Sequence, residues 1–288
     1  MTTTIATQLA LTILISGSLF ALSAVGFTLV YRVTKIMHVA HGVVVLGSGY
    51  AFWWALQRGA SASFAVAFTI AVALAMGWCI HTFVYERLRT RGKIAITMSL
   101  VATVALLVLG QNILLALFGS STRVVSFSKQ LSSADIHTLI VGVSLVSIIF
   151  LGMFLRWSRL GKRMRAVADN SIAAEVVGID SARVRLSAIL LSAVMGGIVG
   201  ILYAMEFNLD PSMGSEIAIR SFSRVLIGGA GSLPGAIFGS FLIEGVEDVG
   251  AFFYSDGLKS VFSFVIVFLF LLLRPRGLFG RKIRKEDL

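Results

Sequence analysis

Two histidines near the start of this 288-residue sequence have types and a spacing that chemistry could use. His38 and His41 lie three residues apart, so both can face the same side of a helix. Two imidazoles with no cysteine or carboxylate nearby are too few ligands for zinc, so we predict no metal site. Packing at a helix end and a role at a pathway or gate, shared with the adjacent Gly42, both stay open for this pair.

A second polar group combines two arginines with a glutamate from later in the chain. Glu244 lies well inside the apolar run 233–253, where a carboxylate is costly unless it is neutral, paired or hydrated. We expect Glu244 to pair with Arg220 or Arg224. Exposure to a cavity and direct contact with a substrate are the alternatives.

No catalytic constellation accompanies these groups. The sequence lacks the G-x-x-x-x-G-K-[ST] loop that cradles phosphates, so we predict that the chain binds no ATP and is not an enzyme. The G-S-G at 47–49 and the scattered Ser and His residues raise the alternative of an intramembrane serine protease, although no motif pairs a nucleophile with a base. We predict no catalytic residue and no cofactor in this chain.

The elements that must position these residues are membrane helices. Only 14% of the residues are charged, against about 25% in a soluble domain, and the mean hydropathy is +0.91. Several apolar runs reach the ~20 residues that a helix needs to cross a bilayer. We predict an all-α, polytopic membrane helical bundle of about eight transmembrane helices that forms one domain over 1–288. The runs lie at 5–31, 38–57, 62–85, 94–118, 136–155, 186–207, 233–253 and 257–274.

The distribution of positive charge predicts the orientation of this bundle. A net charge of +11 would suit nucleic acid, but the basic residues gather beside apolar runs, which indicates a membrane face and no nucleic-acid partner. Of the 25 Lys and Arg residues, 19 fall in the segments 32–37, 86–93, 156–185 and 274–288. Placing these segments in the cytoplasm puts the N-terminus outside and the C-terminus inside, which needs an odd number of crossings.

The Gly-rich stretch 217–232 must then supply one crossing. It is short for a full span, contains two arginines and is followed by Pro234, which suits the first turn of another helix. Irregular backbone at membrane depth is tolerated where protein or a water-lined cavity satisfies it. We therefore predict a partial or broken helix that adjoins a pathway; a short, tilted ordinary helix is the alternative. The candidate pathway residues are His38, His41, Gly42, Arg220, Arg224, Gly229, Gly231 and Glu244.

The loop 156–185 is polar and basic, and its centre has the pattern of a short amphipathic helix. Asp169 and Asn170 can cap such a helix, and Gly178 suits its C-terminal end. One interpretation is a loop that rests on anionic lipid headgroups. The other is a helix that docks into the groove of a cytoplasmic partner as a rigid lever. The candidate coupling residues are Asp169, Asn170, Ile172, Ala173, Ala174, Glu175, Val176 and Gly178.

Four motifs follow one another along the chain. They are "ALSAVGFTLVY" with "HVAHG", "GKRMRAVADNSIAAEVVGID" before a Gly-rich helix, "GGAGSLPGAIFG", and "RPRGLFG". In this order they resemble the permease subunits of bacterial ABC importers for branched-chain and other hydrophobic amino acids. The resemblance spans nearly the whole chain, but 62–155 matches only in hydropathy.

The resemblance implies a translocation subunit in the bacterial inner membrane, with the coupling helix in the cytoplasmic loop 156–185. It also implies partners: two cytoplasmic ATPase subunits that bind ATP and Mg²⁺, a homologous second permease subunit, an extracytoplasmic substrate-binding protein, and membrane lipid. A permease for urea, short amides or small carboxylates is one alternative. A stand-alone channel or secondary carrier for a small neutral solute is another.

Overall fold

The computed structural model describes residues 2–89, 95–125, 132–274 and 277–280, and these residues are nearly all helical. Outside the helices, the described residues form one isolated β-bridge, between Arg123 and Leu209. The helices are α1 (Thr2–Thr34), α2 (His41–Gln57), α3 (Ala62–Ile80), a π-helix (His81–Tyr85), α4 (Glu86–Arg89), α5 (Ala95–Phe118), α6 (Ser133–Trp157), α7 (Arg159–Asp169), α8 (Ser171–Val176), α9 (Ser181–Glu206), α10 (Met213–Gly228), α11 (Leu233–Phe253), a 3₁₀ turn (Asp256–Leu258) and α12 (Lys259–Leu273).

Every apolar run in the sequence forms a helix, which confirms an all-helical membrane bundle. Among the described residues, five helices are long and apolar enough to cross a bilayer, or up to six if the bent pair α10 and α11 makes one span. Helix α2 has only 17 residues, and the apolar part of α12 runs from Val261 to Leu273. The expected count of about eight spans therefore stays a prediction.

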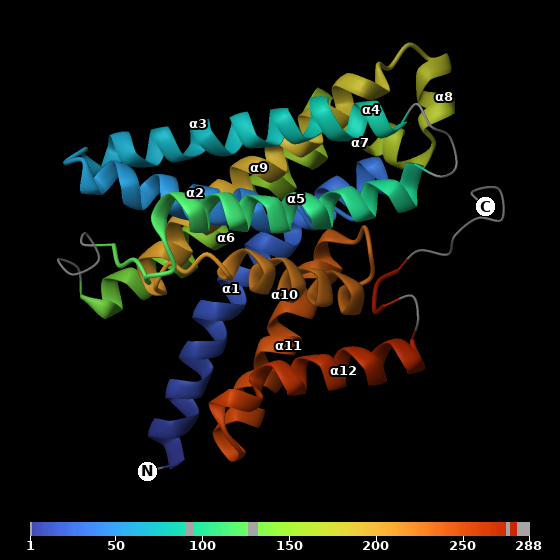
Figure 1. Ribbon diagram of the computed structural model, residues 1–288. Helices are drawn as coiled ribbons and strands as arrows, with labels where there is room; N and C mark the ends of the chain where they lie inside the picture. The colour runs from blue at the N-terminus through green and yellow to red at the C-terminus, as the bar shows by residue number, and fades with distance from the viewer. Residues whose placement is uncertain (1, 90–94, 126–131, 275–276, 281–288) are drawn as a thin grey trace.

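Helices α1 and α9 form the centre of the bundle, because most of their apolar length is buried, whereas α3, α5 and α6 are largely exposed. Helix α1 contacts α6, α9, α10 and α11, and α2 contacts α3, α5, α9 and α10. The ribbon shows that the short helices α4, α7 and α8 lie at the same end of the bundle (Figure 1). The exposed apolar faces of the outer helices suit contact with lipid tails or with another subunit.

Small residues let the central helices approach each other closely. A Cβ atom on Gly200 of α9 would come within 2.6 Å of the Val45 carbonyl oxygen of α2. One on Gly42 of α2 would overlap the Gly214 carbonyl oxygen of α10. Glycine is therefore required at these crossings, as is common where membrane helices pack backbone to backbone.

Candidate functional site

His41 opens α2 at the point where α1, α2 and α9 cross. Its side chain is fully buried, and its Nδ1 lies 3.3 Å from the Ser192 Oγ of α9. The imidazole fits because Gly26 and Gly196 face it; a Cβ on either would lie 3.1 Å from the His41 Cε1. The His41 Nε2 has no hydrogen-bond partner among the described residues. A buried nitrogen of this kind can bind a water molecule or a polar group of a ligand.

His38 lies beside it in the linker between α1 and α2, and only 1% of its surface is exposed. The two imidazole centroids are 6.0 Å apart. The His38 Nδ1 shares a hydrogen bond with the hydroxyl of Tyr85, the last residue of the π-helix. Such π-helical turns are frequent at functional sites, and this one joins His38 to a residue 47 positions away in the chain.

Helices α10 and α11 meet at a sharp elbow, which we define as residues 229–232. The axes of the two helices differ by 114°. Gly229 and Gly231 have φ angles of +97° and +89°, in the left-handed region that favours glycine. The Ser232 side chain then caps α11 by accepting a hydrogen bond from the Gly235 backbone N–H at 3.2 Å. The break falls within the stretch where the sequence predicts a partial or broken helix.

The first turns after the elbow press directly on α10. A Cβ atom on Gly235 would overlap the Gly228 carbonyl oxygen, and one on Gly239 would lie 2.5 Å from the Arg224 carbonyl oxygen. The two backbones therefore touch with no side chain between them. We therefore expect the contact between the two main chains to hold the 114° bend.

Buried charges lie next to this contact. Arg224 and Glu244 form an ion pair, with 0% and 3% of their respective surfaces exposed. A second carboxylate, that of Glu247, lies 3.8 Å from Arg224 and 3.4 Å from Arg220. The Arg224 guanidinium also stacks over the Phe20 ring of α1 at 4.2 Å. The structure thus pairs Glu244 with Arg224 rather than Arg220, and each buried charge has an opposite charge nearby.

The segment 277–280 packs against the elbow and the end of α10. Leu278 and Phe279 donate backbone hydrogen bonds to the carbonyls of Ile227 and Gly228, at 2.8 and 3.0 Å. A Cβ on Gly229 would lie 2.5 Å from the Gly280 nitrogen. Two of the four motifs, the Gly-rich one and the one ending in G-L-F-G, therefore meet in space. Nothing in the local sequence pattern indicates this contact.

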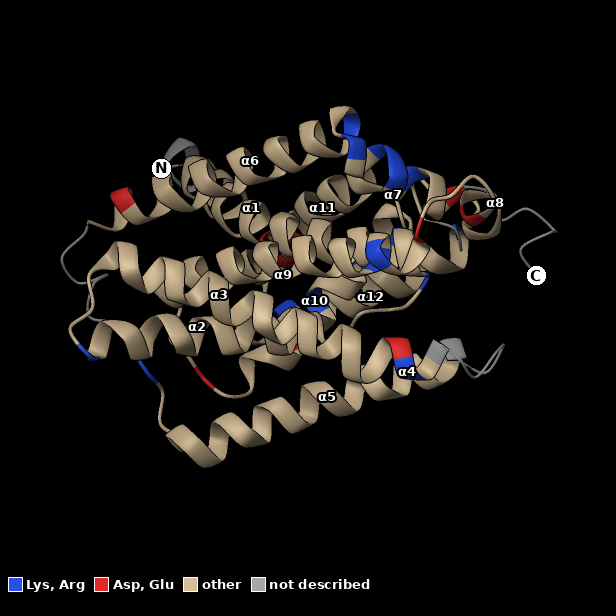
Figure 2. Ribbon diagram, turned by 90° about the horizontal axis from the view of Figure 1, so that it is seen from above, with Lys and Arg blue, Asp and Glu red and all other residues tan. Residues whose placement is uncertain are grey.

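Helix α7 forms the first half of the basic loop. The sequence analysis predicted only one short helix in 156–185, whereas α7 adds eleven helical residues before it. Leu160, Met164 and Val167 are spaced at i, i+4 and i+7, and Met164 and Val167 are buried. This periodicity was the signal that could have found α7. The basic residues at the end of α6 and along α7 lie together at one end of the molecule (Figure 2).

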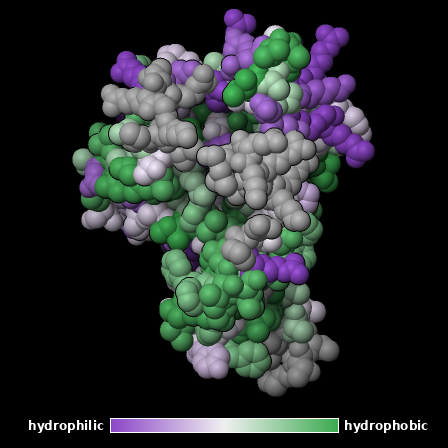
Figure 3. Space-filling view, turned by 90° about the vertical axis from the view of Figure 1, so that its right-hand side faces the viewer, coloured by the Kyte–Doolittle hydropathy of each residue, from purple (hydrophilic) through white to green (hydrophobic). Residues whose placement is uncertain are grey.

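Helix α8 projects from this end with apolar side chains on its surface. Asn170 caps it, accepting a hydrogen bond from the Ala173 N–H at 2.9 Å, and Gly178 follows with a φ of +82°. Ile172 is 74% exposed and Val176 is 82% exposed, while Ala174 alone of the helix is buried. Figure 3 views the molecule from the right-hand side of Figure 1, and at its top a group of hydrophobic atoms lies among hydrophilic ones. An apolar face raised from a charged surface is suited to a partner's groove.

The candidate pathway residues fall into separate groups in space. His38, His41 and Gly42 lie at the crossing around α2, whereas Arg220, Arg224 and Glu244 lie between α10 and α11. Gly229 and Gly231 form the elbow at the end of α10. The sequence analysis missed Tyr85 and Glu247, whose roles depend on contacts between distant segments. Ser192 recurs with Gly196 and Gly200 every four residues along α9, a spacing that predicts close helix packing. Its contact with His41 was not predicted.

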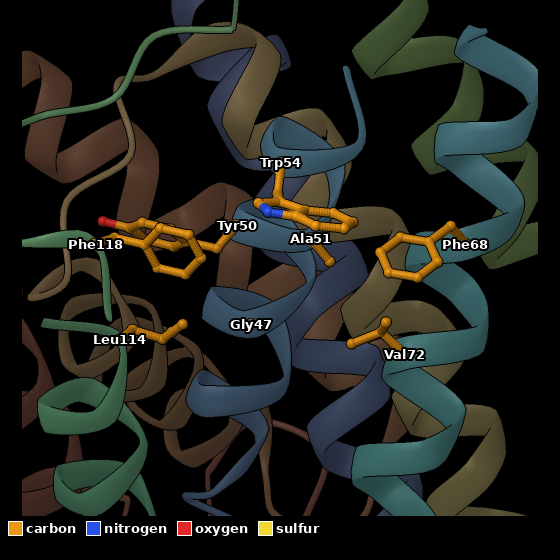
Figure 4. Close-up of a pocket in the computed structure, with 8 residues that line it drawn as sticks. All are labelled: Gly47, Tyr50, Ala51, Trp54, Phe68, Val72, Leu114 and Phe118. Atoms are coloured by element: carbon orange, nitrogen blue, oxygen red, sulfur yellow. The ribbon is translucent and has the colours of Figure 1, made fainter. Parts of the chain in front are cut away.

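Two cavities lie apart from these groups. One, of about 300 Å³, is apolar and lies between α2, α3 and α5, with Trp54 facing Phe68 across it (Figure 4). The other, of about 240 Å³, lies between α1, α6 and α7 and has arginines in its wall. None of the candidate pathway residues lines either cavity.

Comparisons with known proteins identify the family. The sequence profile of the permease component of branched-chain amino acid transport systems matches residues 9–272. The branched-chain amino acid permease LivH of Escherichia coli K12 and BraD of Pseudomonas aeruginosa are each 28% identical, with 92% of both chains covered. In structure, the chain is similar to PsaBC of Streptococcus pneumoniae, with a TM-score of 0.54 and 13% identity over 92% of this chain and 91% of that one. That likeness concerns the fold alone.

The profile covers nearly all the described helices, including the crossing around α2, helix α8 and the elbow. It therefore confirms the resemblance seen in the motifs, and with it a multi-pass permease of the plasma membrane. The chain belongs to the family of permease components of branched-chain amino acid transport systems.

Proposed function

We propose that this chain is the translocation subunit of an ABC importer that carries branched-chain or similarly apolar amino acids. The observation that carries the proposal is the family match over residues 9–272. The substrate named for LivH and BraD, relatives covered over nearly their full length, supports the same class. ATP and Mg²⁺ are bound by two cytoplasmic partner subunits, and an extracytoplasmic protein delivers the substrate to this chain and a homologous second permease.

Helix α8 is the proposed contact with the ATPase subunits. Its exposed Ile172 and Val176 give it an apolar face, and the Asn170 cap and the turn at Gly178 hold it as a short rigid unit. Motion of the ATPases is passed through this unit to α7 and α9, which it joins. The remaining coupling residues are Asp169, Ala173, Ala174 and Glu175.

The proposed pathway runs beside α10, between the buried His41 and the α10–α11 elbow. Gly42 of α2 packs on Gly214 of α10, so a shift of α10 would reach the histidines directly. The same shift would act on the ion pair between Arg224 and Glu244. We infer that α10 is the element whose movement opens and closes the path.

The proposed topology places α4, α7, α8 and the C-terminus in the cytoplasm and the N-terminus outside. The five long helices are joined by α2, α10, α11 and α12, with α10 as the partial crossing, so that the number of crossings is odd. The topology is tested with a cysteine at Val177, which is 74% exposed, after native Cys79 is replaced by Ala. An impermeant thiol reagent added to intact cells should leave this cysteine unlabelled and label it after lysis. Labelling in intact cells would overturn the topology.

The function is tested by reconstitution. The chain is purified with the ATPase and second permease subunits encoded beside it, placed in liposomes, and supplied with the binding protein and radiolabelled leucine, with ATP at the cytoplasmic face. We expect uptake that requires ATP and the binding protein and that excess valine inhibits. Uptake of urea or acetamide in place of leucine would contradict the substrate class. Leucine flux through this chain alone, without ATPases, would favour a stand-alone carrier.

A further inference from the structure

One side of α10 is polar and open, although the helix lies within a membrane bundle. Its side chains, which we call the polar face, are those of Ser212, Ser215, Glu216 and Arg220. Arg220 Nη2 lies 2.9 Å from Glu216 Oε1, in an ion pair whose side chains are 20% and 50% exposed. Ile219, which is 46% exposed, lies beside this pair. Lipid tails would favour apolar side chains on such a surface.

Contacts with α5 show how deep in the membrane the polar face lies. Gln111 of α5 donates hydrogen bonds at 3.1 Å to the carbonyl oxygen of Ser212 and to the hydroxyl of Ser215. Gln111 stands seven residues before Phe118, the end of a helix that is long and apolar enough to span a bilayer. The start of α10 is therefore about 10 Å inside the end of that span.

Helix α10 then runs deeper along α5, towards the end of the bundle where α4, α7 and α8 lie (Figure 1). Leu233, just beyond the elbow, lines a cavity with Arg32 and Arg156, which stand at that end. Glu216 and Arg220 thus lie about one and two turns further inside the membrane than the contact with α5. The exposed ion pair belongs to the interior of the span.

The other sides of α10 are closed by packing. Towards α2, a Cβ atom on Gly42 would overlap the Gly214 carbonyl oxygen and lie 2.8 Å from the Ala218 Cβ, so the two helices touch. Towards α11, the space is occupied by the buried ion pair of Arg224 and Glu244. A solute that passes beside α10 therefore has room on the polar face.

We propose that the polar face of α10 lines the translocation path, with the second permease subunit as the opposite wall, and that Glu216 and Arg220 bind the amino acid in transit. This inference rests on the proposed function. Charged side chains at membrane depth face protein or water, so the exposed pair indicates a wet path on this side. The Glu216 carboxylate receives the ammonium group of the amino acid, and the Arg220 guanidinium receives its carboxylate.

The surroundings of Arg220 suit such an exchange of partners. Its Nη1 lies 3.4 Å from the buried carboxylate of Glu247, so Arg220 keeps one counter-charge when Glu216 turns to the ammonium group. A guanidinium has five N–H donors, which leaves donors for the carboxylate of the solute. Because each charge replaces one opposite partner with another, the amino acid is bound without being trapped. Urea and acetamide carry no charges and cannot replace the pair.

The first test measures whether the polar face is wet, and it does not depend on the solute. The importer is purified with its partner subunits and placed in lipid nanodiscs, with native Cys79 replaced by Ala. Ile219→Cys is compared with Val146→Cys, since Val146 is 67% exposed on the apolar surface of α6. A charged methanethiosulfonate reagent attacks thiolates, which form in water, so Ile219→Cys should react roughly tenfold faster or more. Equal rates, or no reaction at either position, would overturn the proposal.

The second test measures recognition of the charged groups. In liposomes that contain the whole importer, Glu216→Gln should lower ATP-driven leucine uptake roughly tenfold, the scale of one charged hydrogen bond. Glu216→Asp keeps the charge and should retain most of the uptake. Glu86→Gln is the matched control, because the Glu86 side chain is 40% exposed but lies away from α10. Copurification of the partner subunits shows that each variant assembles.

Two results of this second test would overturn the recognition by Glu216. One is normal uptake in Glu216→Gln, and the other is an equal loss in Glu216→Asp, which would make shape rather than charge the cause. A wild-type importer that takes up no leucine would instead refute the proposed function, and the amino-acid assignment with it. The cysteine test would still decide whether the polar face lines a path.

Discussion

The region of the α10–α11 elbow buries charged side chains, whereas helix α8 exposes apolar ones. Around the elbow, Arg224 and Glu244 are buried, each with its partner inside the chain. On α8, Ile172 and Val176 are apolar and face outwards. Each arrangement is costly unless a partner is present. The buried charges of the elbow have their partners within this polypeptide, whereas the proposed partner of α8 is another protein. A change at the elbow should therefore destabilise the chain, and a change on α8 should spare the chain and affect its assembly.

The largest effect on the isolated chain is expected from Arg224→Met. It leaves Glu244 and Glu247 buried beside one another with their nearest shared cation removed. Breaking a buried ion pair from one side costs about 3–5 kcal/mol, so thermal unfolding of the purified chain should occur at a much lower temperature. Arg183→Met removes an exposed pair with Asp180 and should change stability by less than about 0.5 kcal/mol. Equal effects of the two substitutions would erase the contrast between the two regions.

Gly235→Ala should have the next largest effect. Its Cβ would overlap the Gly228 carbonyl oxygen, so the α10 and α11 backbones must separate at about 1–3 kcal/mol. Gly245 lies on the same helix with nothing within 4 Å, and Gly245→Ala should be neutral or stabilising. Unfolding in increasing concentrations of sodium dodecyl sulphate compares the two. If both alanines are tolerated alike, main-chain contact does not fix the bend.

Gly178→Ala tests the end of α8 and should act more weakly. A non-glycine residue at φ +82° costs about 1–2 kcal/mol, but here the space around the Cβ is open. The substitution should therefore destabilise α8 alone. We expect faster hydrogen exchange at the amides of Gly178 and Ile179, which donate hydrogen bonds to the carbonyls of Glu175 and Ala174. The same two amides should exchange more slowly in Gly178→Asn than in Gly178→Ala, because asparagine tolerates this conformation better than alanine. Unaltered exchange in the alanine variant would show that α8 is not held by this turn.

The smallest effect on the chain itself is expected from Ile172→Asp combined with Val176→Asp. Both side chains are already exposed, so stability should change by less than about 0.5 kcal/mol. Copurification of the ATPase subunits should nevertheless be lost, because carboxylates would enter an apolar groove. Ser171→Asp, exposed on the same helix, should retain them. Retention of the ATPases by the double variant would contradict docking through α8.

The sequence predicted the parts of the structure that depend on neighbouring residues. Continuous apolar runs predicted the long helices, and the Asn170 cap with Gly178 predicted α8 within a residue or two. The glycines after α10 predicted a break there, because left-handed backbone needs them. All of these signals lie within one or two helical turns.

What could not be predicted depends on how distant segments meet. No local pattern joins His38 to Tyr85 or the segment 277–280 to the end of α10. The choice of Arg224 over Arg220 as the partner of Glu244 follows from the 114° bend, which no helical periodicity contains. Helix α7, by contrast, could have been predicted, because its i, i+4, i+7 spacing of apolar residues is present in the sequence. The many basic residues of the segment led to its interpretation as a loop.

The contact between segment 277–280 and the end of α10 sets an order of assembly. The carbonyls of Ile227 and Gly228 accept their hydrogen bonds from Leu278 and Phe279, which lie beyond α12. During synthesis the ribosome delivers α10 and α11 to the membrane before these donors exist. The two carbonyls must therefore remain bonded to water or to the insertion machinery until α12 has entered the bilayer. Formation of these two hydrogen bonds is thus a late step in the biogenesis of this protein, and it requires that α12 has already been inserted.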